Sequence, residues 1–194
     1  MRRAGRLLHA NFVAAVLSDL FGIQARSGCF CAGPYIHRLY PVDEEWSERM
    51  QAEALKGRLG AMLSFTRLSF NYYISDTVFD YIVDAVHLLA DQGWKLMPLY
   101  RFDPISGLWR HRRAGGADLT SSLRDAVTAA PARLRTAPES TLADQLEAAR
   151  RIIAIAETHA PPDACGEEAL SEEFERARWF PLPSEGLGTL RGRA

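Results

Sequence analysis

The sequence predicts an α+β protein in which helices pack on one small, mostly antiparallel sheet, followed by a helical C-terminal extension. Apolar residues recur at helical spacing in two segments, residues 12–21 and 78–90. A segment rich in aromatic and β-branched residues, 61–75, lies between them. The segments 94–102 and 107–112 flank Asp-Pro-Ile-Ser, which has the composition of a hairpin turn.

The first expected helix begins near Asn11, which can cap it, and ends at Gly22, which can adopt a left-handed conformation. Residues 23–26 predict a short strand that leads into a turn containing two cysteines. A brief helical turn is expected over residues 35–40, after a proline. The chain thus predicts a helix, a strand and a turn in its first forty residues.

Asp43 is expected to cap a second helix that runs to about residue 57. In the strand predicted at residues 61–75, alternation puts Arg67 on the same face as Leu63, Phe65 and Ser69. A long helix capped by Ser75 or Asp76 follows, with Gly93 behind it. The two segments around the Asp-Pro-Ile-Ser turn then predict a β-hairpin.

The character of the sequence changes after residue 112, where Ala, Gly, Pro, Ser and Arg dominate. Helical stripes return at residues 142–156 and 166–180. We therefore expect two parts, residues 1–112 as one domain and residues 113–194 as a linker and helical extension whose role the sequence does not indicate.

Composition favours a soluble globular protein, with 47% hydrophobic and 24% charged residues. The net charge of -1 argues against a dedicated nucleic-acid binder, and no segment approaches the ~20 apolar residues of a membrane span. Cys29, Cys31 and Cys165 cannot all pair with one another, which favours a reducing cytoplasm.

Cys31 and Arg67 are the two residues that suggest chemistry. Cys31 follows Arg26 and lies between two glycines, where a guanidinium and backbone amides would favour a reactive thiolate; the alternative is a small packing residue in a turn. Arg67 in an apolar strand face would hold a carboxylate or form an internal salt bridge. A metal site is disfavoured, because Cys-x-Cys with His37 fits no usual ligand spacing.

Two motifs carry a family resemblance over residues 7–112. The segment ARSGCFCAGP resembles the Arg-x-Gly-x-x-Cys-Ala-x-Pro motif of class V aminotransferases and group II cysteine desulfurases, which are pyridoxal-phosphate enzymes of fold type I. The segment TRLSFNYYIS resembles the Arg-x-Ser-aromatic strand of the same family. The matching residues are Arg26, Gly28, Cys31, Ala32, Pro34, Arg67, Ser69 and Tyr73.

The resemblance implies the small C-terminal domain of such an enzyme, acting on an amino acid substrate. By analogy, Cys31 would be the nucleophile that carries a persulfide, Arg67 would bind the substrate carboxylate, and Arg26 would lie in the same wall. The family is usually dimeric. Its cofactor, pyridoxal 5'-phosphate, is bound through a lysine of a large domain, whose sequence context neither Lys56 nor Lys95 shares.

Several alternatives stay open at this stage. Cys29 and Phe30 stand where desulfurases usually have two histidines, so desulfurase, lyase and transaminase activities all remain. The chain is expected to supply only part of a site, with the large domain preceding residue 1 or coming from a partner. A non-catalytic interaction module left after loss of that domain, or an unrelated α+β domain with chance motifs, would also fit.

Overall fold

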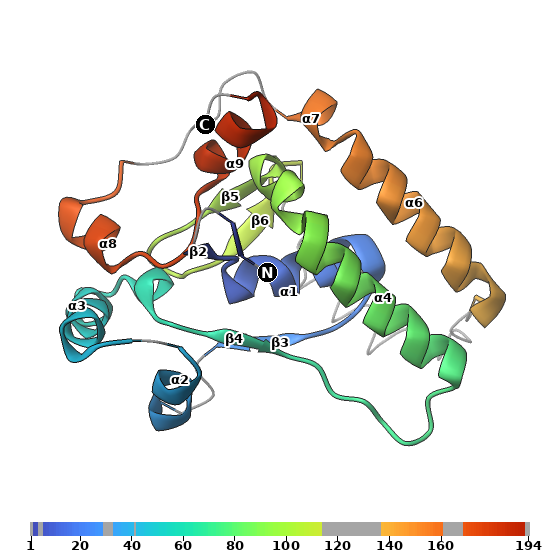
Figure 1. Cartoon of the computed structure of the whole chain (residues 1–194), viewed down its shortest axis with the longest axis horizontal. Helices are drawn as coiled ribbons and strands as arrows, with labels where there is room; N and C mark the ends of the chain where they lie inside the picture. Colours follow the sequence, from blue (N-terminus) through green and yellow to red (C-terminus); the bar gives the residue numbers. More distant parts are fainter. Residues whose placement is uncertain are drawn as a thin grey trace, which may run out of the picture.

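The structure is a computed structural model of the 194-residue chain, and it describes residues 2–3, 6–28, 33–40, 42–113, 137–160 and 169–192. These residues combine helices with short antiparallel strands, as expected for an α+β protein (Figure 1). The helices are α1 (Ala10–Phe21), α2 (Gly33–Leu39), α3 (Glu44–Leu55), α4 (Asp76–Gln92), α6 (Leu142–Ala154), α7 (Ala156–His159), α8 (Glu172–Ala177) and α9 (Pro183–Leu190). Three 3-10 turns accompany them: η1 (Leu59–Ala61), η2 (Gly93–Leu99) and η3 (Glu139–Thr141).

The strands form three separate two-stranded antiparallel ladders. They are β1 (Arg2–Arg3) with β2 (Arg6–Leu7), β3 (Arg26–Gly28) with β4 (Phe65–Arg67), and β5 (Tyr100–Phe102) with β6 (Trp109–His111). This differs from the single sheet that the sequence predicts. Within the described ranges each strand is only two or three residues long and pairs with one neighbour, so helices provide most of the framework.

Helix α1 lies at the centre of the core, with Phe12, Val16 and Leu17 almost completely buried. Gly22 ends the helix in the left-handed conformation predicted for it, with a φ of 66°. The start differs from the prediction, because His9 is the cap and its imidazole accepts from the amide of Asn11. The Asn11 side chain instead donates to the carbonyl of Gly107, 2.7 Å away, and ties α1 to the β5–β6 hairpin.

The predicted caps of the next two long helices are present. The Asp43 carboxylate accepts from the amide of Trp46 at the start of α3, and the Ser75 hydroxyl accepts from the amide of Val78 at the start of α4. The strand expected from residue 94 begins only at Tyr100, because the preceding residues form η2. Pro98 lies within that turn, and a proline lacks the amide that a strand ladder would use.

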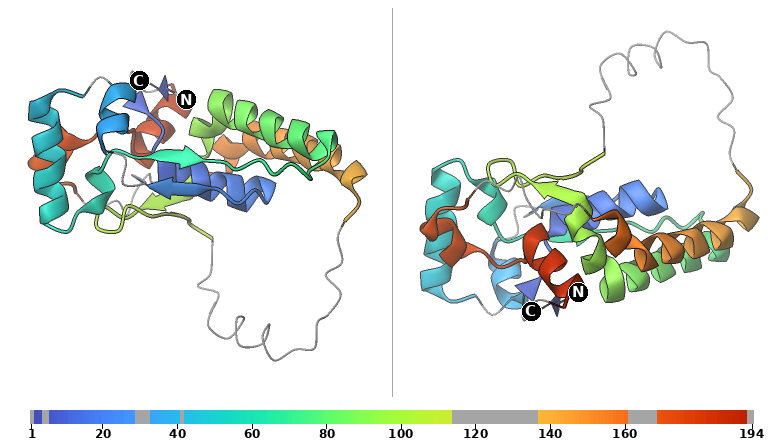
Figure 2. Two further views of the ribbon diagram at one scale, coloured as in Figure 1. Left: turned by 90° about the horizontal axis from the view of Figure 1, so that it is seen from below. Right: turned by 90° about the horizontal axis from the view of Figure 1, so that it is seen from above.

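The C-terminal helices contribute to the same core. Helix α6 runs alongside α4, α8 packs on α3, and α9 packs on η2 (Figures 1 and 2). Phe174, Trp179 and Phe180 are almost fully buried and belong to the cluster that includes Phe12. The indole of Trp179 donates to the carbonyl of Ala61, 3.2 Å away. The predicted helical extension is therefore helical, and it completes the core of the first part.

Two ionic clusters, each built on one buried charged side chain, hold this C-terminal segment. Arg58 donates to both Glu53 and the Ser171 hydroxyl, each at 2.8 Å, and so links the end of α3 to the start of α8. Arg178, only 7% exposed, donates to the Glu175 and Glu185 carboxylates. No helix in the described ranges is both long enough and apolar enough to span a membrane.

Candidate functional site

The β3–β4 ladder brings the two predicted substrate-binding arginines together. Arg26 and Arg67 are directly opposite each other in the register. The hydroxyl of Thr66 donates to the carbonyl of Ala10 in α1, 2.9 Å away, so that side chain faces the core helix. Side chains alternate along a strand and cross-strand partners share a face. Arg26 and Arg67 are both exposed, and as register partners they share one face of the ladder.

An arginine pair of this kind is not by itself a site. Arg101 is opposite Arg110 in the β5–β6 ladder, and Arg3 is opposite Arg6 in the β1–β2 ladder. Like charges directly opposite each other disfavour a ladder by a few tenths of a kcal/mol or more. An anion that contacts both guanidinium groups would offset that repulsion. The β3–β4 pair differs from the other two because both of its arginines fall within the motifs.

The predicted nucleophile lies outside the part of the chain that the structure describes. Cys31 and Cys29 fall between β3 and α2, and Cys165 falls between α7 and α8, all beyond the described ranges. The residue before this gap is Gly28, whose φ of 135° is one that glycine adopts far more readily than other residues. Gly28 pairs with Phe65 at one end of the three-residue ladder, and Arg26 pairs with Arg67 at the other end. The cysteine segment therefore follows the end of the ladder that lies opposite the two arginines.

The two lysines do not fit a pyridoxal-phosphate imine. Lys56 Nζ lies 2.7 Å from a carboxylate oxygen of Glu53, three residues earlier. Lys95 Nζ donates to the side-chain oxygen of Gln92 at 3.1 Å. The imine requires a lysine beside a phosphate-binding cavity, and neither lysine lines the cavities described below.

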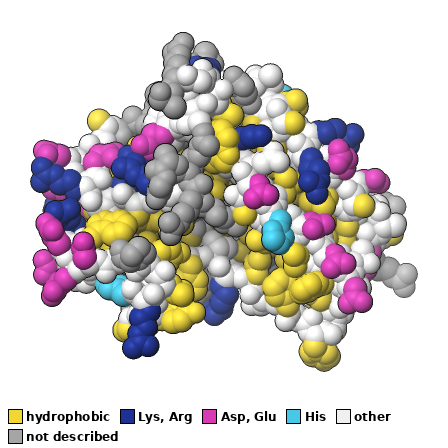
Figure 3. Space-filling model, in the orientation of Figure 1, with side chains coloured by type: hydrophobic (Ala, Val, Ile, Leu, Met, Phe, Trp, Pro, Cys, Tyr) yellow, Lys and Arg dark blue, Asp and Glu magenta, His cyan; other side chains and the backbone are white. Residues whose placement is uncertain are grey.

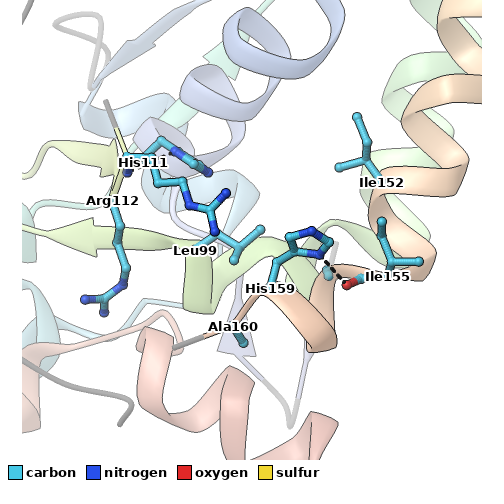
Figure 4. A pocket seen from close by; sticks show the side chains of 9 residues that line it. Leu99, His111, Arg112, Ile152, Ile155, His159 and Ala160 are labelled. Atoms are coloured by element: carbon cyan, nitrogen blue, oxygen red, sulfur yellow. Dashed lines mark hydrogen bonds between the residues drawn. The ribbon is translucent and has the colours of Figure 1, made fainter. Parts of the chain in front are cut away.

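A cavity of about 440 Å³ lies where the end of β6 and the end of η2 face helices α6 and α7 (Figure 4). Its apolar wall comes from Leu99, Ile152 and Ile155, and the two isoleucines are 44% and 48% exposed. Four basic or ionisable side chains complete the lining: His111, Arg112, Arg113 and His159. No Asp or Glu is among the described residues that line it.

The carbonyl and amide that the two histidines contact favour opposite tautomers. Nδ1 of His111 accepts from the amide of Arg113 at 3.2 Å, so in the neutral ring Nε2 carries the proton. Nδ1 of His159 lies 3.1 Å from the carbonyl of Ile155, which can only accept, so here Nδ1 carries the proton. Figure 4 shows the His159 ring between Leu99 and Ile155. Arg112 is held by η2, because its Nε donates to the carbonyl of Pro98 at 2.8 Å.

A second hollow of about 370 Å³ adjoins the first and shares Leu99, His111, Arg113 and Ile152 with it. Asp19 and Tyr100 line its far side, where the phenol donates to the carboxylate at 3.0 Å. Burial and the adjacent Asp19 raise the pKa of Tyr100 well above its usual range. The Asp19 carboxylate therefore accepts a hydrogen bond from a Tyr100 hydroxyl that stays neutral.

Sequence reasoning missed this cavity. Its lining combines residues around 99, 111 and 155, which only tertiary packing brings together. His111 and His159 belong to no recognisable sequence motif. The sequence does offer one indication of the cavity, the isoleucines at 152 and 155. They widen the apolar face of the α6 segment beyond the side that packs on α4.

Within the described ranges no cluster of three or more His, Cys, Asp or Glu side chains is placed to hold a metal ion. No known protein family, curated protein or solved structure matches this chain. The function is therefore inferred from the residues of this chain alone.

Proposed function

We propose that residues 1–112 are the small domain of a class V aminotransferase-like or cysteine desulfurase-like enzyme, with the fold of the fold type I small domain. Residues 113–194 are appended to it, and their described helices share its core. The observation that carries this proposal is the register of the β3–β4 ladder, in which the arginines of the two motifs are opposite each other. Motifs 41 residues apart in sequence (67 minus 26) thereby meet at one exposed face.

In this function Arg67 binds the carboxylate of an amino acid substrate, and Arg26 adds positive charge to the same wall. A guanidinium presents parallel N–H donors that match a carboxylate, and two cations on one face increase the attraction. Cys31 is the candidate nucleophile for sulfur transfer. The choice among desulfurase, lyase and transaminase is left to experiment.

The cofactor belongs to another domain in this proposal, because neither Lys56 nor Lys95 suits it. That domain either precedes this sequence in a longer protein or comes from a partner in a cytoplasmic, dimeric enzyme. Four exposed aromatic side chains support a covered surface next to the ladder: Phe70, Tyr72, Tyr73 and Phe79. Tyr72 is 99% exposed, and Figure 3 shows hydrophobic surface in the region of α4 and the segment before it. A large exposed apolar area of this kind is typical of an interaction surface.

The first test uses the full chain alone with one equivalent of pyridoxal phosphate, followed by borohydride reduction and peptide mass analysis. We expect no stoichiometric adduct at Lys56 or Lys95. A stoichiometric adduct that disappears in Lys56→Arg or Lys95→Arg would contradict the proposal, because the chain would then hold the cofactor by itself.

The second test adds a lysine-bearing class V large domain and measures turnover of amino acids. We expect Arg67→Gln to raise KM at least tenfold through loss of the carboxylate contact, while Arg101→Gln, the matched arginine of the other ladder, leaves it within about twofold. Equal effects of the two variants would count against Arg67. Sulfide release from cysteine that survives Cys31→Ala would exclude the nucleophile role.

The exposed aromatic side chains also favour the second candidate, a non-catalytic interaction module. In that case the chain would bind a protein partner through Phe70, Tyr72, Tyr73 and Phe79, and substitution of these residues would abolish binding. Arg67→Gln would then leave binding of the partner unchanged. An amino acid that strengthens binding in an Arg67-dependent way would favour the enzyme.

A further inference from the structure

We propose that the cavity between β6, η2, α6 and α7 binds a small amphiphilic carboxylate, a molecule with one carboxylate head and an apolar body. This site is distinct from the β3–β4 arginine pair and shares none of its residues. It would let such a ligand influence the packing of the C-terminal helices on the core.

The apolar wall argues for a ligand with a hydrocarbon body. Ile152 and Ile155 leave 44% and 48% of their surface exposed, although both belong to segments that otherwise pack on the core. Leu99 faces them from the end of η2 (Figure 4). Covering aliphatic side chains that already line a concavity is favourable and needs no change of the backbone.

The polar lining argues for a carboxylate head. Nε2–H of His111 is the donor left by the bond that its Nδ1 accepts, and Arg113 is exposed beside it. Arg112 adds a second positive charge, with its Nε fixed on the carbonyl of Pro98. The head would therefore bind at the β6 end, while the body lies over the isoleucines of α6 and α7.

The volume sets the size of the ligand. At about 30 Å³ for each water-sized group, 440 Å³ holds roughly fifteen such groups. Octanoate, with about ten non-hydrogen atoms, is thus a suitable probe. The neighbouring hollow carries Asp19, but that carboxylate accepts from Tyr100 on the far side and does not line this cavity. The described residues that line the cavity thus contribute the positive charges of Arg112 and Arg113 and no negative charge.

The experiment is calorimetric titration of the full chain with octanoate, octanol and octylammonium. We expect saturable octanoate binding with a Kd on the order of 1 mM or tighter. Octanol should bind at least about fivefold more weakly and octylammonium at least tenfold more weakly, since they lack the negative head. Equal affinity for all three compounds would contradict the preference for a carboxylate head. If octanoate showed no saturable binding, the proposed binding site itself would be wrong.

Paired variants locate the binding. Ile152→Glu and Arg113→Glu should each weaken octanoate binding at least tenfold, the first by placing a carboxylate in the apolar wall and the second by reversing the charge at the head. Ile105→Glu and Arg110→Glu, which are exposed on the hairpin and do not line the cavity, should change it less than about twofold. Circular dichroism of each variant is the control for folding. An unchanged affinity in Ile152→Glu would place the ligand elsewhere.

Discussion

His9 is a buried ionisable side chain in an aromatic shell. The ring stacks on Trp179 at a centroid distance of 5.2 Å and meets the edge of Phe180 at 4.5 Å. Nδ1 accepts from the amide of Asn11, so Nε2 carries the proton and faces the carbonyl of Gly60. Burial lowers the pKa of His9 from 6.5 to about 4, against a smaller opposing effect of the Gly60 carbonyl.

This pKa predicts a loss of stability in mild acid. Above pH 6.5 both folded and unfolded chains hold a neutral His9; as the pH falls from 6.5 to 4, only the unfolded chain takes up the proton. The free energy of unfolding should therefore fall by about 3 kcal/mol over this interval. Urea unfolding at pH 7, 5.5 and 4 measures it. The His9 ring signals in NMR should not titrate above about pH 5, and titration near pH 6.5 would contradict the prediction.

Carboxylates change the free energy of unfolding at lower pH than His9 does, so the two contributions can be told apart. Burial alone would raise the pKa of Glu53, but hydrogen bonds and the charges of Lys56 and Arg58 outweigh it and lower the pKa below 4.5. Such a group adds stability above its unfolded pKa, and this stability is lost as the pH falls through the lower, folded value. The loss that begins near pH 6.5 is therefore the one expected from His9 and not from Glu53.

Among the elements, η1 and the β5–β6 hairpin lie in close contact. The amides of Leu59 and Gly60 donate to the carbonyls of Ile105 and Pro104, at 2.9 and 3.1 Å. A Cβ on Gly60 would lie 2.6 Å from Cζ of Phe102. Only a residue without a side chain fits between the turn and the aromatic ring.

Gly60→Ala should lower the free energy of unfolding by about 1–3 kcal/mol, since the Phe102 ring must move. Near-UV circular dichroism should change as well, because Phe102 packs against Trp109 and Phe180. Gly57→Ala is the control: its φ of 81° makes a side chain unfavourable, but nothing lies within 4 Å of the added Cβ. If both variants gave the same aromatic spectrum as the original protein, the packing argument would be wrong.

Local signals explain which elements the sequence predicted. The caps at Asp43 and Ser75 and the left-handed Gly22 depend on neighbouring residues, and all three are confirmed. The Asn11 cap was wrong because Asn11 bonds to Gly107, which lies 96 residues away. Separate ladders, the Arg26–Arg67 register and the cavity likewise depend on distant contacts. Periodicity along one segment does not contain such information.

For the whole molecule, the shared core allows a test of whether a domain boundary lies at residue 112, as the sequence predicts. Phe174, Trp179 and Phe180 are 1%, 4% and 0% exposed. Burial of three such side chains contributes about 5–9 kcal/mol, comparable with the 5–15 kcal/mol stability of a typical domain. We expect a chain that ends at residue 168 to be unfolded or to unfold at much lower denaturant.

The control for this truncation ends at residue 191, which keeps α9 complete. It should unfold at nearly the same denaturant concentration as the full chain, measured by tryptophan fluorescence. A chain of residues 1–112 that folds cooperatively with full-chain stability would show that the N-terminal part is an independent domain, contrary to our expectation from the shared core.

The contacts between the two ends of the chain have a consequence for synthesis on the ribosome. The amide of Leu7 donates to the carbonyl of Trp179, and Arg6 pairs with Glu185 at 3.0 Å. At about 5–20 residues per second, the partner of Leu7 is made roughly 10–30 seconds after it. During this delay the apolar surface that Trp179 and Phe180 later cover stays exposed on the nascent N-terminal half.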